Sequence, residues 1–386
     1  MRIPVCEPYL GGREKEYVLD CLATNWISSA GKYLVQFEQA FARYCGCEHG
    51  IGTTSGTTAL HLAIAAVAVG PGDEVIMPTF TIAATVFATL YVGAIPVLVD
   101  VEPDTWTMRV DQVAAKLGPR TRAVLPVHMY GHPCDMDPLR ELTGRRGLRL
   151  LEDAAEVHGA EYKGRKCGSL GDAACFSFYA NKILTTGEGG MVVTNDETIA
   201  ERCRSLKNLA FNRERRFLHD AIGFNYRMTN LQAAMGLAQL EKLEEYVALR
   251  RQHAASYTKL LQDVEGLRLP VERPWARNVY WMYGVVVEDD FGCSRDDLAS
   301  GLAERGVETR TFFIPMHEQP LFQEKGLFRS EHYPVASDIA RRGLYLPSST
   351  GLREDEIAYV ADAVRDVQRV ARQRRPRQAP TTRARR

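Results

Sequence analysis

The stretch FSFYANKILTTGEGG, from Phe176 to Gly190, places Lys182 between an apolar run and a glycine-rich turn. A lysine charge that is cut off from water is costly, so such a residue needs a counter-charge, a lowered pKa or a covalent bond. An amine in a partly desolvated pocket loses its proton readily and can condense with an aldehyde to form an imine. A surface lysine on a hairpin is the alternative that this stretch alone leaves open.

Asp153 stands 29 residues earlier, where an acidic pair ends the leucine-rich run LRLLEDAAE. A buried strand of a parallel sheet would carry Asp153 at its carboxyl end, where such sheets bind ligands, and the carboxylate would need a cation there. Alone, Asp153 is more simply explained as a cap or turn residue. Together, Lys182 and Asp153 meet the needs of pyridoxal phosphate, because the amine binds its aldehyde and the carboxylate keeps its pyridine nitrogen protonated.

The segment TTSGTTAL, residues 53–60, offers groups for a phosphate. Small hydroxyl residues and one glycine open a predicted helix, whose free N–H groups and positive dipole end favour an anion. A capped helix with no further use fits the segment equally well. The segment lacks the lysine of a P-loop, and no GxGxxG follows a strand, which disfavours nucleotide triphosphate hydrolysis and nicotinamide binding.

Short apolar runs alternate with helical segments between about residues 50 and 200. The runs that predict strands are DEVIMP, AIPVLVDV, AVLPVHMYG, LRLLEDAAE, ACFSFYA and GGMVVTN. Between them, SGTTALHLAIAAVAV and CDMDPLRELTGRRG have helical spacing. This alternation predicts an α/β fold with a mostly parallel sheet that helices cover on both faces.

The remaining chain predicts a smaller domain and a tail. The pattern LQAAMGLAQLEKLEEYVALRRQHAASYTKLLQ predicts a long connecting helix, and VYWMYGVVVE, SRDDLASGLAERG and VETRTFFI indicate an α+β domain. We therefore assign residues 1–245 to a large cofactor-binding domain and residues 246–371 to a small C-terminal domain. Residues 372–386 hold seven arginines and no acidic residue, which predicts a disordered basic tail. DNA binding by this tail is a separate hypothesis, which salt-sensitive binding would reveal.

The composition disfavours several classes of protein. The 386 residues include 48 Lys and Arg and 48 Asp and Glu, so no global positive charge attracts nucleic acid or an anionic membrane. No apolar run approaches the ~18 to 20 residues that cross a bilayer. The nine cysteines lack the paired spacing of a zinc site, and the first residues lack a signal-peptide pattern. We expect a cytoplasmic protein with reduced thiols, without metal, nucleic acid or membrane partners.

Seven motifs together resemble the DegT/DnrJ/EryC1/StrS family of pyridoxal phosphate sugar aminotransferases. They are SGTTAL, PTFT, VHMYGHPCDMDP, EDAAE, FSFYANKILTTGEGGM, GFNYRMTNLQAA and IPMH, and the resemblance covers about residues 3–370. It implies the aspartate aminotransferase-like fold, called fold type I, and a homodimer with active sites at the interface. Within the family, NWISSAGKY, YGHPCDMD and NKILTTGEGGM look most like GDP-perosamine synthases. That likeness implies L-glutamate as amino donor and C4 of GDP-4-keto-6-deoxy-D-mannose as acceptor.

The resemblance also assigns roles to individual residues. Lys182 matches the lysine that holds the cofactor covalently, Asp153 the partner of the pyridine nitrogen, and Glu156 a residue on the side of the ring's phenolic oxygen. The remaining matches are Gly56, Thr57 and Ser177 in the phosphate cradle, Asn225 reaching the phosphate of the neighbouring subunit, and Tyr226, Arg227 and His317 bordering the sugar-nucleotide site.

One residue departs from the family pattern. Ile82 stands in PTFTIAAT where the family often has an aromatic residue that stacks on the cofactor ring. An aliphatic side chain still covers the ring by dispersion, but it gives up a stacking contribution of about 0.5 to 1.5 kcal/mol. We therefore expect weaker cofactor retention with unchanged chemistry.

Alternatives remain open at this stage. The acceptor can be a dTDP- or UDP-linked 4-keto or 3-keto sugar, because no residue in the sequence distinguishes the bases. A non-catalytic regulatory protein on the same scaffold is a further alternative. Family relatives with histidine in place of the lysine act as sugar dehydratases, so Lys182 implies transamination.

Overall fold

Seven strands form the central sheet of the larger lobe, in the order β1-β9-β8-β5-β4-β2-β3. A computed structural model describes residues 2–212, 214, 215 and 217–374 of the chain. The strands are β1 (His49–Thr53), β2 (Glu74–Pro78), β3 (Ile95–Val99), β4 (Thr121–Val124), β5 (Arg149–Asp153), β8 (Ala173–Ser177) and β9 (Gly190–Thr194). Only β9 runs against its neighbours, so the other six strands end at one edge of the sheet.

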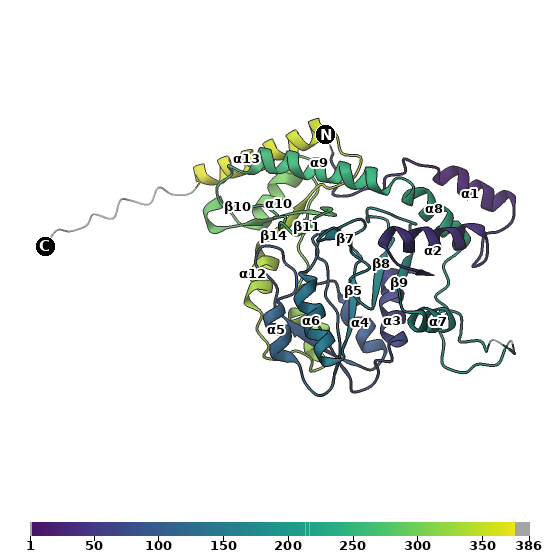
Figure 1. Cartoon of the computed structure of the whole chain (residues 1–386). Coiled ribbons are helices and arrows are strands. Elements are labelled where there is room, and N and C mark those ends of the chain that lie inside the picture. Colours follow the sequence, from purple (N-terminus) through teal and green to yellow (C-terminus); the bar gives the residue numbers. More distant parts are fainter. Residues whose placement is uncertain (1, 213, 216, 375–386) are drawn as a thin grey trace.

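Helices enclose this sheet, as Figure 1 shows. Successive residues of a strand point to opposite faces, and β9 is buried at every position, so both of its faces are covered. In the larger lobe these helices are α2 (Lys32–Cys45), α3 (Gly56–Ala66), α4 (Ala83–Tyr91), α5 (Val110–Lys116), α6 (Met136–Arg146) and α7 (Glu197–Leu206). The arrangement confirms the predicted α/β class.

A smaller lobe surrounds a four-stranded antiparallel sheet in the order β10-β12-β14-β13. Its strands are β10 (Leu267–Arg268), β12 (Tyr283–Val287), β13 (Arg310–Thr311) and β14 (Gly343–Leu346). Helices α9 (Leu243–Leu261), α10 (Arg295–Glu304) and α13 (Glu354–Arg374) and the short 3-10 helix η1 (Asp289–Phe291) contribute to its core. The helices α11 (Pro320–Glu324) and α12 (Pro334–Arg342) and the 3-10 helix η2 (Met316–Glu318) follow in the same half of the chain, but their buried apolar residues pack in the larger core. A third sheet joins β6 (Glu161–Tyr162) to β7 (Arg165–Lys166) and β11 (Ala276–Arg277).

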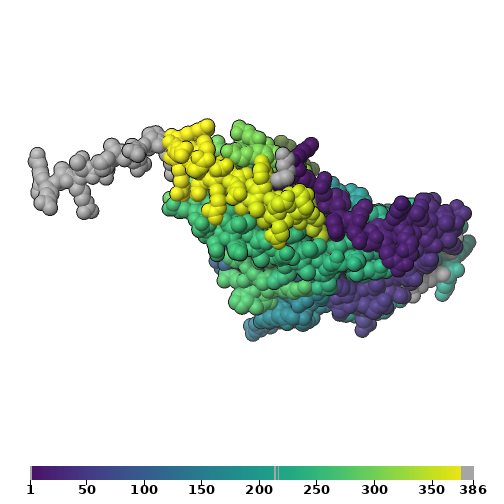
Figure 2. Space-filling model, turned by 90° about the horizontal axis from the view of Figure 1, so that it is seen from above, coloured from purple at the N-terminus to yellow at the C-terminus, as the bar shows by residue number. Residues whose placement is uncertain are grey.

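The chain crosses between the two lobes more than once. Ile3 packs in the smaller core, and its backbone N–H donates to the carbonyl of Gly306 at 2.8 Å. Figure 2 shows the N-terminal residues in purple and α13 in yellow on the same face. In the opposite direction, Met316 and Tyr333 of the C-terminal half pack in the larger core. The predicted boundary between residues 245 and 246 stays a prediction.

Two details differ from the expected elements. The predicted connecting helix is two helices, α8 (Asn230–Leu240) and α9, with a break at Glu241 and Lys242. The break lets α8 pack on α2 and on α1 (Glu14–Ala23), whereas α9 packs on α13. At the other end α13 continues to Arg374, so residues 372–374 of the predicted tail are helical, and residues 375–386 lie outside the described residues.

Within the described residues, no helix is both long and apolar enough to cross a membrane. All nine cysteines lie in this part of the chain, and each is a free thiol.

An aromatic cluster under β8 is expected to stabilise the larger lobe. The ring of Phe41 meets those of Phe176 and Phe178 edge to face, with centroids 4.9 and 5.2 Å apart. We expect Phe41→Ala to cost about 3–5 kcal/mol of stability, because the substitution leaves a cavity in a packed core. Thermal unfolding followed by circular dichroism measures the loss. Leu321→Ala on exposed α11 is the control, and an equal melting temperature for both variants would contradict this account.

Candidate active site

A cavity of about 330 Å³ opens at the carboxyl edge of the central sheet. Loops that follow β1, β2, β5 and β8 reach it, because the ends of parallel strands meet at one edge. Seven of the eleven residues predicted for the site line this cavity: Gly56, Thr57, Ile82, Asp153, Glu156, Ser177 and Lys182.

Lys182 lies five residues beyond the end of β8, after a turn in which its N–H donates to the carbonyl of Tyr179 at 2.9 Å. Its Nζ lies 3.7 Å from Oε1 of Glu156 and 3.6 Å from the ring centroid of Trp281. Only 10% of the side chain is exposed. Burial lowers the pKa of Lys182, which favours the neutral amine that attacks an aldehyde.

Glu156 faces Lys182 across the cavity wall. Its Oε2 accepts a hydrogen bond from the backbone N–H of Tyr130 at 2.8 Å. Burial raises the pKa of Glu156 to about 7, while it lowers that of Lys182. Two groups whose pKa values approach each other exchange a proton at little cost, so this pair is suited to proton transfer.

Asp153 ends β5 as a buried carboxylate without an ion-pair partner among the described residues. Its Oδ2 accepts a hydrogen bond from the hydroxyl of Thr85 at 2.8 Å, and burial raises its pKa. Because Thr85 gives its only hydroxyl proton to Asp153, the hydroxyl of Thr81, 2.9 Å away, must donate to Thr85. A cation placed next to Asp153 would therefore be strongly stabilised.

Two buried side chains, those of His128 and Glu152, form a hydrogen bond that supports the backbone around Asp153. The N–H of His128 donates to the carbonyl of Asp153 at 3.1 Å. Nδ1 of His128 accepts from the N–H of Cys134, so Nε2 carries the proton and donates to Glu152 at 3.0 Å. Burial opposes the ionisation of Glu152, but His128 and the backbone N–H groups of residues 168, 170 and 171 hold its pKa below the usual value.

The first turn of α3 forms the opposite wall of the cavity. Ser55 caps this helix and accepts from the N–H of Thr58 at 3.2 Å, while the first N–H groups of a helix have no partner within it. A Cβ at Gly56 would lie 2.7 Å from Cβ of Ser177, so the two segments touch at this point. The helix end therefore presents N–H and hydroxyl donors where an anion would bind.

These features fit pyridoxal phosphate. Asp153 is a buried anion that lacks a cation, Lys182 is a desolvated amine, and α3 supplies donors for a phosphate. Ile82 lines the same cavity with 52% of its surface exposed, so it has room to lie against a ring. The donor set matches the pyridine nitrogen, the aldehyde and the phosphate of this one cofactor.

Three predicted residues lie outside the cavity of this chain. Oδ1 of Asn225 accepts from Nε of Arg227 at 2.9 Å, and Nη1 of Arg227 donates to Asn208. The hydroxyl of Tyr226 lies 2.9 Å from Nδ1 of His61. The role of this segment in a neighbouring subunit stays a prediction.

His317 also lies outside the cavity. Ser337 donates its proton to Glu318, so Nε2 of His317 donates to Ser337 and Nδ1 accepts from the hydroxyl of Thr79 at 2.8 Å. Its neighbour Met316 donates its N–H to the carbonyl of Thr79. These bonds fasten η2 to the loop before α4.

Several residues of the site were not anticipated. Thr85 lies in the first turn of α4, four residues after Thr81, and this local spacing brings the two hydroxyls together, so the sequence did carry that signal. Trp281 and Tyr345 come from the smaller lobe and line the cavity beside Lys182. Nothing in a strand-like run such as VYWMYGVVVE indicates that its tryptophan meets a lysine 99 residues away.

Several known proteins are similar to this chain in sequence and in fold. The profile of the DegT/DnrJ/EryC1/StrS aminotransferase family matches residues 8–365. The chain is 45% identical to "GDP-perosamine synthase" of Caulobacter vibrioides, over 95% of this chain and 98% of the relative. It is 40% identical to "dTDP-3-amino-3,4,6-trideoxy-alpha-D-glucose transaminase" of Streptomyces venezuelae, over 88% and 89%. The crystal structure of S. venezuelae DesV in complex with a ketimine intermediate superposes with a TM-score of 0.87 at 39% identity, covering 92% of this chain and 94% of DesV.

The hydrogen bonds from Thr81 to Thr85 and from Thr85 to Asp153 are expected to support cofactor binding. Thr85→Val keeps the shape of the side chain but removes a hydrogen bond to a charged group, a contribution of about 1.5–3 kcal/mol. We expect pyridoxal phosphate to bind about tenfold more weakly or worse, measured by absorbance titration of the apoprotein. Thr89→Val is the matched control, since Thr89 lies one turn later and donates only to the carbonyl of Thr85. Equal affinities for the two variants would refute the role of this hydroxyl.

The contact between α3 and β8 gives a second expectation. In Gly56→Ala the added Cβ must displace Ser177 or the start of α3, so the donors for the phosphate move apart. We expect weaker binding of pyridoxal phosphate, together with a loss of about 1–3 kcal/mol of stability from overpacking. Gly144→Ala is the control, because nothing lies within 4 Å of its Cβ and alanine favours a helix. A Gly56→Ala protein with unchanged cofactor affinity would show that the cradle lies elsewhere.

Proposed function

Because the chain belongs to the DegT/DnrJ/EryC1/StrS aminotransferase family, we propose that it moves the amino group of L-glutamate to C4 of GDP-4-keto-6-deoxy-D-mannose, which yields GDP-perosamine. The observation that carries the transamination chemistry is the desolvated amine of Lys182 beside Glu156, in one cavity with Asp153. The choice of a GDP-linked acceptor is supported by the 45% identity to a GDP-perosamine synthase along nearly the whole chain.

Each residue has a distinct task in this proposal. When bound, pyridoxal phosphate supplies an aldehyde for covalent attachment and a ring that accepts electrons. Lys182 would hold that aldehyde at rest and, with its amine free, would remove the proton from Cα of glutamate. Asp153 stabilises the positive charge on the pyridine nitrogen through both half-reactions. Glu156 accepts and returns a proton at Nζ of Lys182, which resets the amine.

The second half-reaction runs the proton transfer in reverse. After 2-oxoglutarate leaves, the keto sugar takes its place, and Lys182 delivers a proton to C4 of the sugar. The indole ring of Trp281, 3.6 Å from Nζ, stabilises the protonated lysine and limits where the side chain can move. The face from which Lys182 delivers the proton sets the stereochemistry of the new amine.

A homodimer is part of the proposal. Trp26, Tyr91 and Ile222 have 57%, 60% and 90% of their surfaces exposed, which leaves apolar area that a partner can bury. A second copy of the chain would cover such residues and bring Asn225 to the neighbouring cofactor phosphate, as the family resemblance implies.

An alternative acceptor has its own support. The S. venezuelae relative acts on a dTDP-linked sugar with nitrogen at C3, and its identity of 40% is close to the 45% of the GDP-perosamine synthase. An experiment must therefore decide which nucleotide base the acceptor carries and which carbon of the sugar receives the amino group.

A panel of keto sugars tests the proposal. Purified protein with pyridoxal phosphate and glutamate is supplied with GDP-, dTDP- and UDP-linked 4-keto-6-deoxy sugars and a dTDP-linked 3-keto sugar. We expect kcat/KM for the GDP-linked sugar to exceed the others at least tenfold, with nitrogen at C4 by NMR. A preference for any other acceptor would refute the GDP assignment.

Lys182→Ala tests the amine itself. We expect loss of turnover together with loss of borohydride-stable cofactor attachment, detected by mass spectrometry of the peptide 176–190. Lys207→Ala is the control, because Lys207 also has a mostly buried amine but pairs with Glu38 away from the cavity. Turnover that survives in Lys182→Ala would show that another lysine carries the cofactor.

A further inference from the structure

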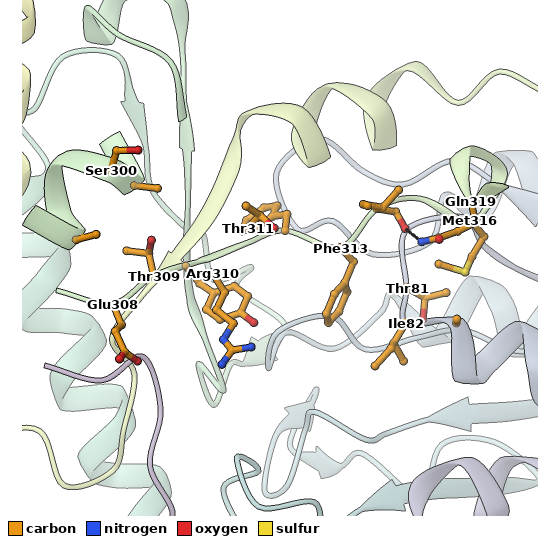
Figure 3. A pocket seen from close by; sticks show the side chains of 16 residues that line it. Thr81, Ile82, Ser300, Glu308, Thr309, Arg310, Thr311, Phe313, Met316 and Gln319 are labelled. Carbon is orange, nitrogen blue, oxygen red and sulfur yellow. Dashed lines mark hydrogen bonds between the residues drawn. The ribbon is translucent and has the colours of Figure 1, made fainter. Parts of the chain in front are cut away.

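A second, larger cavity of about 1050 Å³ adjoins the catalytic cavity. The two share Thr81, Ile82, Phe313 and Tyr345, so these residues stand at the passage between them. Figure 3 shows the outer cavity bordered by the segment after α10 on one side and by Thr81 and Ile82 on another. With the cofactor in the inner cavity, this outer one offers space for the part of a substrate that does not react.

The two charged residues that line the outer cavity differ in their partners. Its only charged lining residues in the described part of the chain are Glu308 and Arg310. Oε1 of Glu308 is bound by Nη2 of Arg2 at 2.7 Å, an ion pair that lowers the pKa of Glu308. Arg310, in contrast, makes no side-chain hydrogen bond or ion pair with any described residue. The guanidinium donors of Arg310 are therefore available to an anion, while Glu308, whose pKa the charge of Arg310 also helps to lower, is already bound by Arg2.

Arg310 is placed by the strand pair β13 and β14. It lies directly opposite Tyr345, and opposite residues of antiparallel strands project to the same face. Because Tyr345 lines both cavities, that face is the one at the passage. Figure 3 shows Arg310 between Glu308 and Phe313, with its guanidinium extended from the backbone to the same side as Phe313.

We propose that Arg310 binds an oxyanion of the substrates as they enter the site. This inference rests on the proposed function, which brings two anions in turn: the carboxylate of the amino donor and the diphosphate of the sugar nucleotide. A guanidinium pairs with two oxygens of either group at once, which a lysine cannot do. Hydroxyl groups of Ser300, Thr309 and Thr311 line the same cavity and add donors for the oxygens.

Arg310 is not needed for the fold. It is exposed, and no described residue accepts a hydrogen bond from its side chain. Substitution therefore leaves the folded protein intact and isolates the effect on binding. Arg310→Gln removes the charge, and Arg310→Lys keeps the charge but loses the paired donors.

The experiment measures the two anions separately on the holoenzyme. Calorimetry with glutarate, which has no amine to transfer, reports the carboxylate, and calorimetry with GDP reports the diphosphate. Stopped-flow absorbance then follows the half-reaction with glutamate and the half-reaction with the keto sugar. Arg145→Gln on α6 is the control, since Arg145 is an exposed arginine paired only with Glu141.

We expect Arg310→Gln to weaken glutarate, GDP or both about tenfold or more, as the loss of a charge-assisted hydrogen bond predicts. Arg310→Lys should be intermediate, and Arg145→Gln should match the unaltered protein. If glutarate binding is weakened, Arg310 binds the carboxylate of the amino donor, and if GDP binding is weakened, it binds the diphosphate. Changes below twofold in both arms would overturn the inference.

Failure of the inference is separable from failure of the proposed function. If the unaltered protein aminates the GDP-linked sugar while Arg310→Gln binds both probes normally, only the role of Arg310 is wrong. If the unaltered protein prefers another sugar nucleotide but Arg310→Gln still loses affinity for glutarate or for GDP, the anion site stands and the acceptor is reassigned.

Discussion

Burial of charge without full compensation is the constraint on which the site depends. Asp153 is held ionisable by one threonine and one backbone N–H, with no cation at ion-pair distance among the described residues. A buried carboxylate in that position has a large desolvation penalty. A cationic ring nitrogen that binds next to it would offset this penalty, so the site favours such a group. Lys182 is kept reactive by the same loss of water, and its approach to Glu156 prevents the amine from being an isolated buried charge.

The topology of the central sheet brings these groups together. Strands β5 and β8 are neighbours and parallel, with Asp153 beside Cys175 in register, so the loop that carries Lys182 begins next to the carboxylate. The antiparallel β9 returns to the same edge, where the carbonyl of Ser55 leaves no space for a side chain at Gly190. The start of α3, proposed to hold the phosphate, and the loop of Lys182 therefore follow two strands, β1 and β8, that are separated only by β9.

The fold of the larger lobe could be predicted from the local sequence pattern because its strands are short, apolar and separated by turn residues. The position of the site could be predicted because the carboxyl ends of parallel strands lie at one edge of the sheet. Lys182 and Asp153 were proposed as site residues on these grounds, and the spacing of Thr81 and Thr85 would have allowed the same proposal for Thr85. Trp281 and Arg310 were not, since both belong to the smaller lobe and meet the site only through packing that no local periodicity encodes. The break between α8 and α9 was missed for the same reason: uninterrupted helical spacing does not reveal two different partners.

The crossing of the chain between the lobes limits how the enzyme can move. Residues near the N-terminus are bonded into the smaller lobe at Gly306 and Ser348, while η2 is bonded to the loop after β2 through Thr79. A rotation of the smaller lobe would either carry these N-terminal residues with it or break their bonds to Gly306 and Ser348. If the enzyme closes around its substrates, the N-terminal segment is therefore part of the moving body, although it precedes the larger lobe in the sequence.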